Sequence, residues 1–346
     1  MKRHQEGAWQ VNQFFIFISS ISIFIVILKF ASDLLVPFLI SIAIAIILNP
    51  IFTYLKTKHI PKVISLIAII IISLIPVVVL AETIALEVKS LTHNFHNLSQ
   101  DFTHTMDNSS VFLNKIGITV DEDFLNKIIA KSNLSDIVHG LASQVSSQFS
   151  NIFLIFFTAA FMLMEAEFLY NKMIKIGKEN NRDINEWMKI VSKIKSYFVI
   201  KVRTSLITAI WAFIVLWYFD ISYTFLWVSL VFFLNFVPVI GSILAAIPPI
   251  IMAFIDNDAI TAFWVASWYF TINMVVGNIL EPKIMGKGLG LSALVIFISM
   301  TFWGWVFGPA GMILSVPLTM VMQFMFEQYE ETKWVSLMLS DYEKEK

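Results

Sequence analysis

The chain has 346 residues, of which 58% are hydrophobic and 14% are charged, with a formal net charge of −1. This composition is far more apolar than that of a soluble domain and predicts an all-helical (all-α) polytopic membrane protein. A net charge near zero excludes a nucleic-acid partner held by bulk basicity. The sequence contains no cysteine, which excludes disulfides, thiolate nucleophiles and cysteine-ligated metal centres.

Three apolar segments at the start of the chain, residues 14–30, 34–55 and 63–86, are predicted transmembrane helices. The first meets Lys29 and another apolar segment rather than a small-residue cleavage site. We therefore expect it to be retained as a span and not removed as a signal peptide. The three spans form a predicted N-terminal unit, residues 1–86.

Residues 87–150 are less apolar and carry more acidic than basic side chains. We expect them to form a small extracytoplasmic helical region. Apolar residues recur at spacings of three or four within residues 91–106 and again within 134–149. The second pattern runs into the fourth predicted span, residues 151–170, and so predicts a long helix that projects from the membrane. The two apolar faces either pack against each other as a small cap or contact other subunits.

Lysine and arginine concentrate in residues 172–203, after the fourth span. The positive-inside rule places this segment in the cytoplasm, together with both termini and the tail, residues 331–346. Lys201 is counted among these cytoplasmic charges. Apolar residues within 184–198 share one helix face, so we expect an amphipathic helix that lies along the headgroup layer. Residues 151–203 are thus predicted to be the fourth span followed by a cytoplasmic amphipathic helix.

Residues 204–330 are predicted to form the transport core. They contain two predicted spans, residues 204–219 and 259–277, and two stretches without Asp, Glu, Lys or Arg, residues 221–255 and 288–326. Each charge-free stretch is too long for one span of about 20 residues and slightly short for two. Gly and Pro interrupt both stretches half-way, so we expect two re-entrant helical hairpins beside about six full transmembrane helices. The flanking charges predict that the first hairpin enters from outside and the second from the cytoplasm.

The two broken stretches resemble each other in sequence. Gly241-Ser-Ile-Leu-Ala-Ala-Ile-Pro248 and Gly311-Met-Ile-Leu-Ser-Val-Pro317 share a Gly, an Ile-Leu pair and a Pro at nearly the same spacing. One span plus one hairpin, repeated with the opposite direction of insertion, predicts an inverted repeat. The two-fold axis of such a repeat places a site near the bilayer midplane.

Three runs of the sequence resemble the signatures of the autoinducer-2 exporter (AI-2E) family: Asn235 to Gly241, Asn278 to Ser292, and Gly308 to Leu318. The order of spans, outer region and broken segments is also similar to that family, so the resemblance covers nearly the whole chain. It implies a transporter that forms homo-oligomers, with a pentamer as the expected form. Some family members resemble exporters of a small furanone used in quorum sensing, and others resemble sodium or lithium/proton antiporters.

The candidate substrate or ion path follows the broken main chain, because unpaired carbonyl and amide groups inside a membrane must face protein, water or a solute. We expect the path to be lined by Asn235, Pro238, Gly241, Asn273, Asn278, Glu281, Gly308, Pro309 and Gly311. The residues expected to shape the helices and turns around it are Pro248, Pro282, Gly286, Gly288 and Pro317. The alternative is that the breaks only let the chain reverse, with Asn235 capping its own backbone.

Glu281 and Asp220 are the candidate coupling acids. Each lies at one end of a predicted span, where a carboxyl group could exchange a proton or a monovalent cation. The alternative is that headgroup water solvates both acids, with Lys283 or Lys287 as ion-pair partners. The acids of the next connector are expected to be solvated: Asp256 and Asp258.

The leading functional hypothesis is a secondary transporter of the bacterial cytoplasmic (inner) membrane that exports, or facilitates the passage of, a small polar solute such as an autoinducer-2-like metabolite. The first alternative is a Na+(Li+)/H+ antiporter in which Glu281 is the exchanging acid. The second is a non-transporting membrane scaffold. We expect contact with membrane lipid, but no enzymatic activity, no cofactor, no nucleic acid and no metal site. Three histidines in the outer region are expected to be solvated: His93, His96 and His104.

Overall fold

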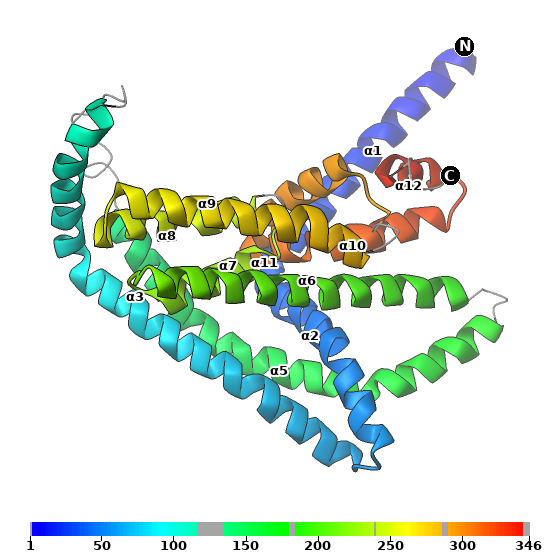
Figure 1. The fold of residues 1–346 in the computed structure, drawn as a ribbon. Helices are drawn as coiled ribbons and strands as arrows, with labels where there is room; N and C mark the ends of the chain where they lie inside the picture. The colour runs from blue at the N-terminus through cyan, green and yellow to red at the C-terminus, as the bar shows by residue number, and fades with distance from the viewer. Residues whose placement is uncertain (1, 116–133, 180–183, 239, 286–289, 342–346) are drawn as a thin grey trace.

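The computed structural model describes residues 2–115, 134–179, 184–238, 240–285 and 290–341, and every regular element in these ranges is a helix (Figure 1). The all-helical prediction is therefore confirmed for this part of the chain. The elements are α1 (Lys2–Phe30), α2 (Ser32–Thr57), α3 (Lys62–Lys115), α5 (Leu134–Glu179), α6 (Ile184–Tyr218), α7 (Thr224–Leu234), α8 (Gly241–Asp256), α9 (Ala259–Val275), the π-helix η1 (Val276–Leu280), α10 (Glu281–Met285), α11 (Ala293–Glu327) and α12 (Lys333–Leu339).

Among the described residues, six helices are long and apolar enough to cross a membrane, and the chain is a multi-pass membrane protein. They are Ser32–Thr57, Lys62–Asn94, Asn151–Glu179, Glu186–Tyr218, Ala259–Leu280 and Ala293–Glu327, the last of which is divided into two halves at Gly308. In α1 the described apolar segment is Ile18–Phe30, and the span over residues 14–30 stays a prediction. Large apolar side chains such as Phe153, Phe157 and Phe161 on α5 are exposed, as expected of surfaces that contact lipid.

α3 and α5 are the longest helices, with 54 and 46 residues, or about 81 and 69 Å at 1.5 Å per residue. The long helix predicted to begin near residue 134 and to run into the fourth span is confirmed as α5. The unit boundaries proposed at 86/87 and 150/151 both fall inside these continuous helices. The outer region therefore joins the spans without an intervening loop at either point.

The apolar face within residues 91–106 packs inside its own chain. Leu91 and Leu98 lie against the core formed by α6 to α9, and the rings of Phe102 and Phe254 have centroids 5.5 Å apart. The predicted partners of this face were a second outer helix or another subunit, and α8 was not among them. The matching side chains of residues 134–149 lie outside the part that the structure describes.

α6 runs without interruption from Ile184 to Tyr218, so the segment expected in the headgroup layer is the first half of a membrane helix. Part of its apolar face turns inward, because Tyr197 and Phe198 are buried in a core shared with α2 and α11. A single apolar helix face fits neighbouring helices as well as it fits a membrane surface, so the end of this face packs on other helices, while the location of the segment in the headgroup layer stays a prediction. Lys201, counted as a cytoplasmic charge, is also buried.

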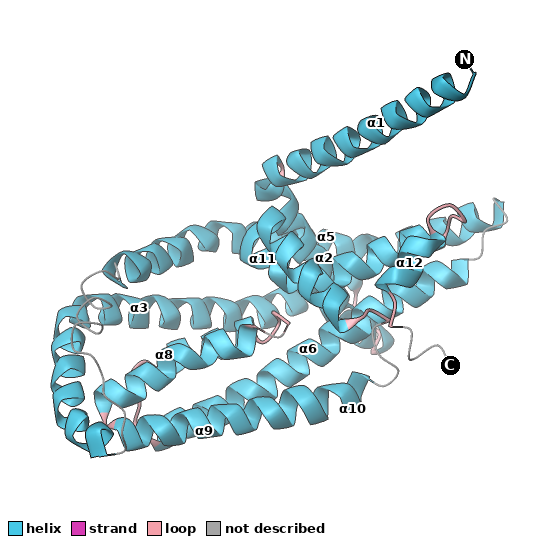
Figure 2. Ribbon diagram, turned by 90° about the horizontal axis from the view of Figure 1, so that it is seen from above, coloured by secondary structure: helices cyan, strands magenta, loops and turns pink. Residues whose placement is uncertain are grey.

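α2 and α5 pack closely through small residues. The buried Ser41 donates its hydroxyl hydrogen to the carbonyl of Ile155 at 3.0 Å, and Ala45 and Ala159 are buried beside it. Small side chains let membrane helices approach closely and gain van der Waals contact. α1 extends away from this bundle (Figure 2).

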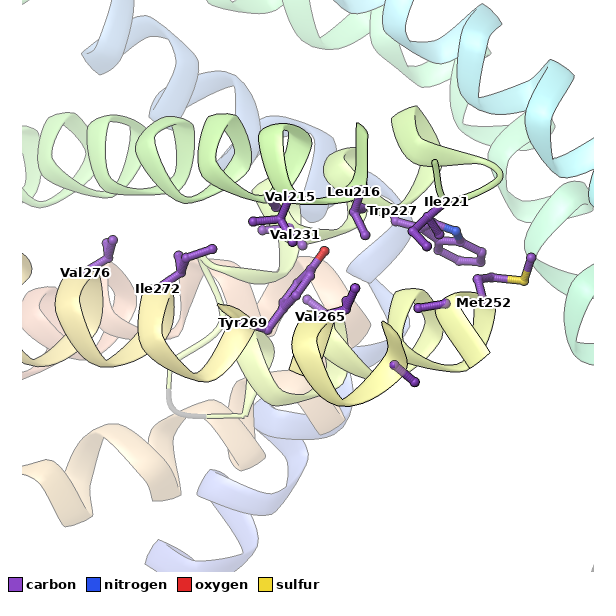
Figure 3. Close-up of a cluster of buried hydrophobic side chains, with 14 residues drawn as sticks. Val215, Leu216, Ile221, Trp227, Val231, Met252, Val265, Tyr269, Ile272 and Val276 are labelled. Carbon is purple, nitrogen blue, oxygen red and sulfur yellow. The ribbon is translucent and has the colours of Figure 1, made fainter. Parts of the chain in front are cut away.

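The largest buried apolar cluster fills the space between α6, α7, α8 and α9 (Figure 3). Each helix contributes a large side chain: Leu216, Trp227, Met252 and Tyr269. These contacts fix the two short helices α7 and α8 against the long helices α6 and α9, and so position the segment between α7 and α8.

Candidate transport site

α7 and α8 form an antiparallel pair, named hairpin A (Thr224–Asp256). At its base, the N–H of Ser222 donates to Asp256 Oδ2 at 2.7 Å. Since these two residues are 34 positions apart, the chain between them reverses direction and returns to its starting point. The reversal lies between Leu234 and Gly241, where neither helix continues.

Gly241 occupies the tightest point of this reversal. A Cβ atom on Gly241 would lie 1.8 Å from the carbonyl oxygen of Leu234, so any other residue would force the backbone to move. Just before it, the N–H of Ile240 donates to the carbonyl of Pro238 at 2.6 Å. The helix interruption predicted from Pro238 and Gly241 is therefore present.

α11 contains the second reversal, and its two halves are named hairpin B (Ala293–Glu327). Gly308 divides them with φ 66° and ψ −152°, a conformation that is essentially restricted to glycine. The hydroxyl of Ser299 donates to the carbonyl of Ser315 at 3.1 Å and also bonds with the hydroxyl of Thr319. Ser299 and Ser315 are 16 positions apart and would be separated by about 24 Å in a continuous helix. α11 therefore folds back on itself at Gly308, next to Pro309.

The two reversals share one construction. A Cβ atom on Gly311 would lie 1.9 Å from the carbonyl oxygen of Trp303, which repeats the close approach of Gly241 to Leu234. Hairpin A ends just before α9 begins, and hairpin B begins after α10 ends (Figure 1). The bases of the two hairpins therefore lie at opposite ends of the rod formed by α9, η1 and α10.

A buried ion pair lies at the tip of hairpin A. Lys201 Nζ on α6 is 2.6 Å from Glu281 Oε1 on α10, and their side chains are only 9% and 16% exposed. Lys201 Nζ also donates to the carbonyl of Asn235 at 3.4 Å. The side chain of Asn235 donates to Ser205 Oγ at 3.0 Å. α6 therefore holds the unwound end of α7 and the acid of α10 in one polar cluster, and Asn235 bonds to α6 rather than capping its own backbone.

The π-helix η1 positions Glu281. Pro282 has no N–H to donate to the preceding turn, and the chain widens into a π-helix over Val276–Leu280 just before it. Such a turn shifts the register of the residues that follow, and Glu281 comes to face Lys201. The predicted partners were different: Lys283 is exposed, and Lys287 lies outside the described residues.

The inner face of α6 carries polar residues that the sequence analysis missed. Lys201 is followed by Thr204, Ser205 and Thr208, all of which are buried. The hydroxyl of Tyr197, one turn before Lys201, is buried without a hydrogen-bond partner among the described residues. The recurrence of polar residues at helical spacing from 197 to 208 is the signal that could have found this face.

Other predicted site residues lie elsewhere. Asn273 is half-buried and Asn278 is exposed. Asp220 is exposed in the turn between α6 and α7, at the opposite end of the membrane half of α6 from Lys201, so the structure does not bring the two candidate acids together.

The residues expected to shape the helices lie inside them where the structure describes them. Pro248 lies inside α8 and Pro317 inside α11. Gly286 and Gly288 lie outside the described residues.

The two acids expected to be merely solvated both have defined partners. Asp256 accepts the hydrogen bond from Ser222 that closes the base of hairpin A. Asp258 caps α9, because its side chain accepts a hydrogen bond from the N–H of Thr261 at 2.7 Å. Both acids are exposed, in keeping with the expectation that they are solvated, and each also accepts a backbone hydrogen bond.

Comparison with known proteins identifies the family of this chain. The family description "AI-2E family transporter" matches residues 18–331. The AI-2 transport protein TqsA of Escherichia coli (strain K12) is 35% identical over 318 residues, which cover 92% of each chain. A presumed transport protein of Haemophilus influenzae is 32% identical, with 94% of this chain and 95% of the relative covered. YhhT, a presumed transport protein of Escherichia coli, is 27% identical over 86% of this chain and 85% of its own. The family resemblance seen in the sequence is thus confirmed, and this membrane protein belongs to the AI-2E transporter family.

Proposed function

We propose that the protein is a secondary transporter whose solute passes the tip of hairpin A, next to the Lys201–Glu281 pair. The observation that carries this proposal is the contact between unwound main chain and a buried ion pair, made through Asn235. Interrupted helices in transporters present main-chain groups to solutes. Ionisable residues inside apolar helices commonly mark solute or ion pathways. Because both members of the pair belong to one chain, we place the path within one protomer.

The helix lengths in hairpin A favour insertion and return on the same side of the membrane. α7 has 11 residues and α8 has 16, or about 17 and 24 Å, both less than the roughly 30 Å hydrocarbon core. The positive-inside rule then puts the base of hairpin A outside and the base of hairpin B in the cytoplasm. In this arrangement each span and its hairpin form one unit of an inverted repeat.

The solute that we propose is a small polar metabolite, and the direction is export. TqsA is described as an AI-2 transport protein, so an autoinducer-2-like metabolite is the first solute to test, and a role in quorum sensing would follow from it. Sodium/proton exchange is less favoured, because Lys201 already occupies the carboxylate of Glu281 at 2.6 Å. A non-transporting scaffold would have no need of the close glycine contacts at the two tips.

Glycine substitutions in reconstituted protein test this proposal. Liposomes are loaded with AI-2 or with one of a panel of small neutral and charged metabolites, and efflux is followed with and without a pH gradient. We expect efflux of at least one solute from the parent protein and its loss in Gly241→Ala and Gly311→Ala, because the added Cβ would displace the tips. Gly277→Ala is the matched control, since a Cβ atom there meets nothing within 4 Å.

Two results of this assay would contradict the proposal. If Gly241→Ala and Gly311→Ala fold and release solute as fast as the parent protein, the scaffold would be favoured. Proton flux on addition of sodium, abolished by Glu281→Gln, would favour the antiporter.

We also propose that the protein lies in the bacterial cytoplasmic membrane with both termini inside, as a homo-oligomer with a pentamer as the expected form. The family membership supports this assembly, and the exposed apolar faces of the helices leave room for it. Native mass spectrometry of the detergent-purified protein counts the subunits, and a monomer would contradict it.

A further inference from the structure

We propose that Lys201 is a specificity-determining residue that makes the transport site electrically neutral and thereby restricts it to solutes without net charge. The inference rests on the proposed function, since it concerns the solute that passes the Lys201–Glu281 pair. It names a substrate class: small uncharged molecules that carry hydroxyl or carbonyl groups.

The charge on Lys201 is balanced by a single acid. Among the described residues, Lys201 is the one charged residue that is buried. α7, α9 and η1 contain no Asp, Glu, Lys or Arg, and the only acid of α8, Asp256, lies at the far base of hairpin A. On the same elements as the pair, the nearest basic side chains, Arg203 and Lys283, are exposed. Within the described part of the chain, the net charge of the site is therefore the sum of Lys201 and Glu281, which is zero.

A neutral pair of this kind rejects free ions of either sign. A monovalent cation would need the carboxylate of Glu281, but the ammonium of Lys201 lies 2.6 Å from it and repels the cation. An anion would need Lys201 and is repelled in turn by Glu281. Separating the pair for either ion would leave one buried charge without a partner, which is strongly unfavourable among apolar helices.

A neutral polar solute could form a hydrogen bond with the hydroxyl of Tyr197, on the same helix as Lys201. The hydroxyl of Tyr197 is buried and has no hydrogen-bond partner among the described residues. It lies on the same face of α6 as Lys201, one turn earlier. Buried hydroxyl groups are normally paired, so a solute hydroxyl or carbonyl could complete this one and leave the ion pair intact.

Charge-selective flux through reconstituted variants tests the inference. The probes are erythritol and ribose as neutral solutes, Na+ as the cation and Cl− as the anion, each measured in liposomes. We expect the parent to pass a neutral probe at a rate independent of membrane potential and to pass neither ion. Lys201→Met should raise Na+ flux at least tenfold, and Glu281→Gln should raise Cl− flux at least tenfold. The double variant, which is neutral again, should pass neither ion, and Arg203→Met is the control for loss of an exposed positive charge on α6.

A binding measurement decides the question even if no probe is transported. In detergent, the melting temperature is compared in NaCl and in N-methylglucamine chloride. We expect Na+ to raise the melting temperature of Lys201→Met, whose Glu281 lacks its partner, and to leave the parent and the double variant unchanged. A parent protein that responds to Na+ as strongly as Lys201→Met would overturn the inference. So would a folded Lys201→Met protein without any response. If no probe is transported, AI-2 included, the proposed function is contradicted. The comparison of melting temperatures in the two salts still decides the role of Lys201.

Discussion

Glu87 on α3 accepts a hydrogen bond from the main-chain N–H of Leu226, a residue 139 positions later in the first turn of α7. The N-cap residue of α7 is Tyr223, which provides no side-chain cap and has a left-handed conformation with φ 59°. The carboxylate of Glu87 therefore caps α7 from a different helix. Asn94, also on α3, donates to the hydroxyl of Tyr223 at 3.3 Å. α3 thus holds the first turn of hairpin A at its base.

Replacing Glu87 should weaken this attachment. Glu87→Ala removes both the hydrogen-bond acceptor and a negative charge from a helix N-terminus, and we expect a loss of about 1–2 kcal/mol in the free energy of unfolding. Glu87→Gln keeps an acceptor oxygen and should lose less. Thermal unfolding in one detergent, followed by circular dichroism, measures both. Glu82→Ala is the control, because Glu82 is exposed on the same helix. Equal midpoints for Glu87→Ala and Glu82→Ala would show that the cap contributes nothing.

The polar contacts between the two halves of hairpin B should be stabilising. The hydroxyl of Thr319 bonds with Ser299 and accepts a hydrogen bond from Trp303 Nε1 at 3.2 Å. Thr319→Val preserves the shape but leaves the buried Nε1–H of Trp303 without its acceptor and removes one of the two hydrogen bonds of Ser299, which we expect to cost about 1–3 kcal/mol. The same unfolding measurement checks this, with Thr301→Val as control, because the hydroxyl of the exposed Thr301 bonds only within its own helix turn, to Phe297. A midpoint for Thr319→Val at or above that of Thr301→Val would refute the prediction.

The Lys201–Glu281 pair should show strong coupling in a double-mutant cycle. Lys201→Met or Glu281→Gln alone leaves a buried charge without its partner, and we expect each to cost about 3–5 kcal/mol. The double variant should cost clearly less than the sum, since no charge remains buried. The exposed pair of Lys56 and Glu167 serves as comparison, where loss of one partner should cost about 0–1 kcal/mol. Additive effects at the buried pair would mean that the two side chains do not stabilise each other.

The breaks in the helices were predictable from the sequence because their geometry is local. At Gly241 and Gly311 a neighbouring carbonyl leaves no room for a Cβ atom, and Gly308 has a backbone conformation that other residues avoid. These constraints act over a few residues, so they appear as Gly and Pro in otherwise apolar runs.

The partner of Glu281 was not predictable in the same way. The pair depends on α6 meeting α10, and contacts of this kind leave no local pattern. The many lysines of residues 172–203 indicate a cytoplasmic segment, but this count does not show that one of them, Lys201, is buried between helices. The helical spacing of Tyr197, Lys201 and Ser205 on one face was the better signal.

The cap of α9 should make a pH-dependent contribution to stability. Asp258 accepts a hydrogen bond from the N–H of Thr261, which lowers the pKa of the Asp258 carboxyl below its ordinary value. A carboxyl with a lower pKa in the folded state stabilises that state above the pKa of the unfolded chain, about 3.9. The contribution is lost as the pH falls through the folded value.

Asp258→Ala should therefore lower the free energy of unfolding by about 1 kcal/mol at neutral pH, and the difference from the parent should shrink at about pH 3 as the parent carboxyl becomes protonated. Asp258→Asn is the matched variant, because an Asn side chain also caps helices but does not titrate. Melting temperatures of the three proteins at both pH values measure the effect. A deficit of Asp258→Ala that is the same at both pH values would mean that the charge of Asp258 plays no part in capping α9.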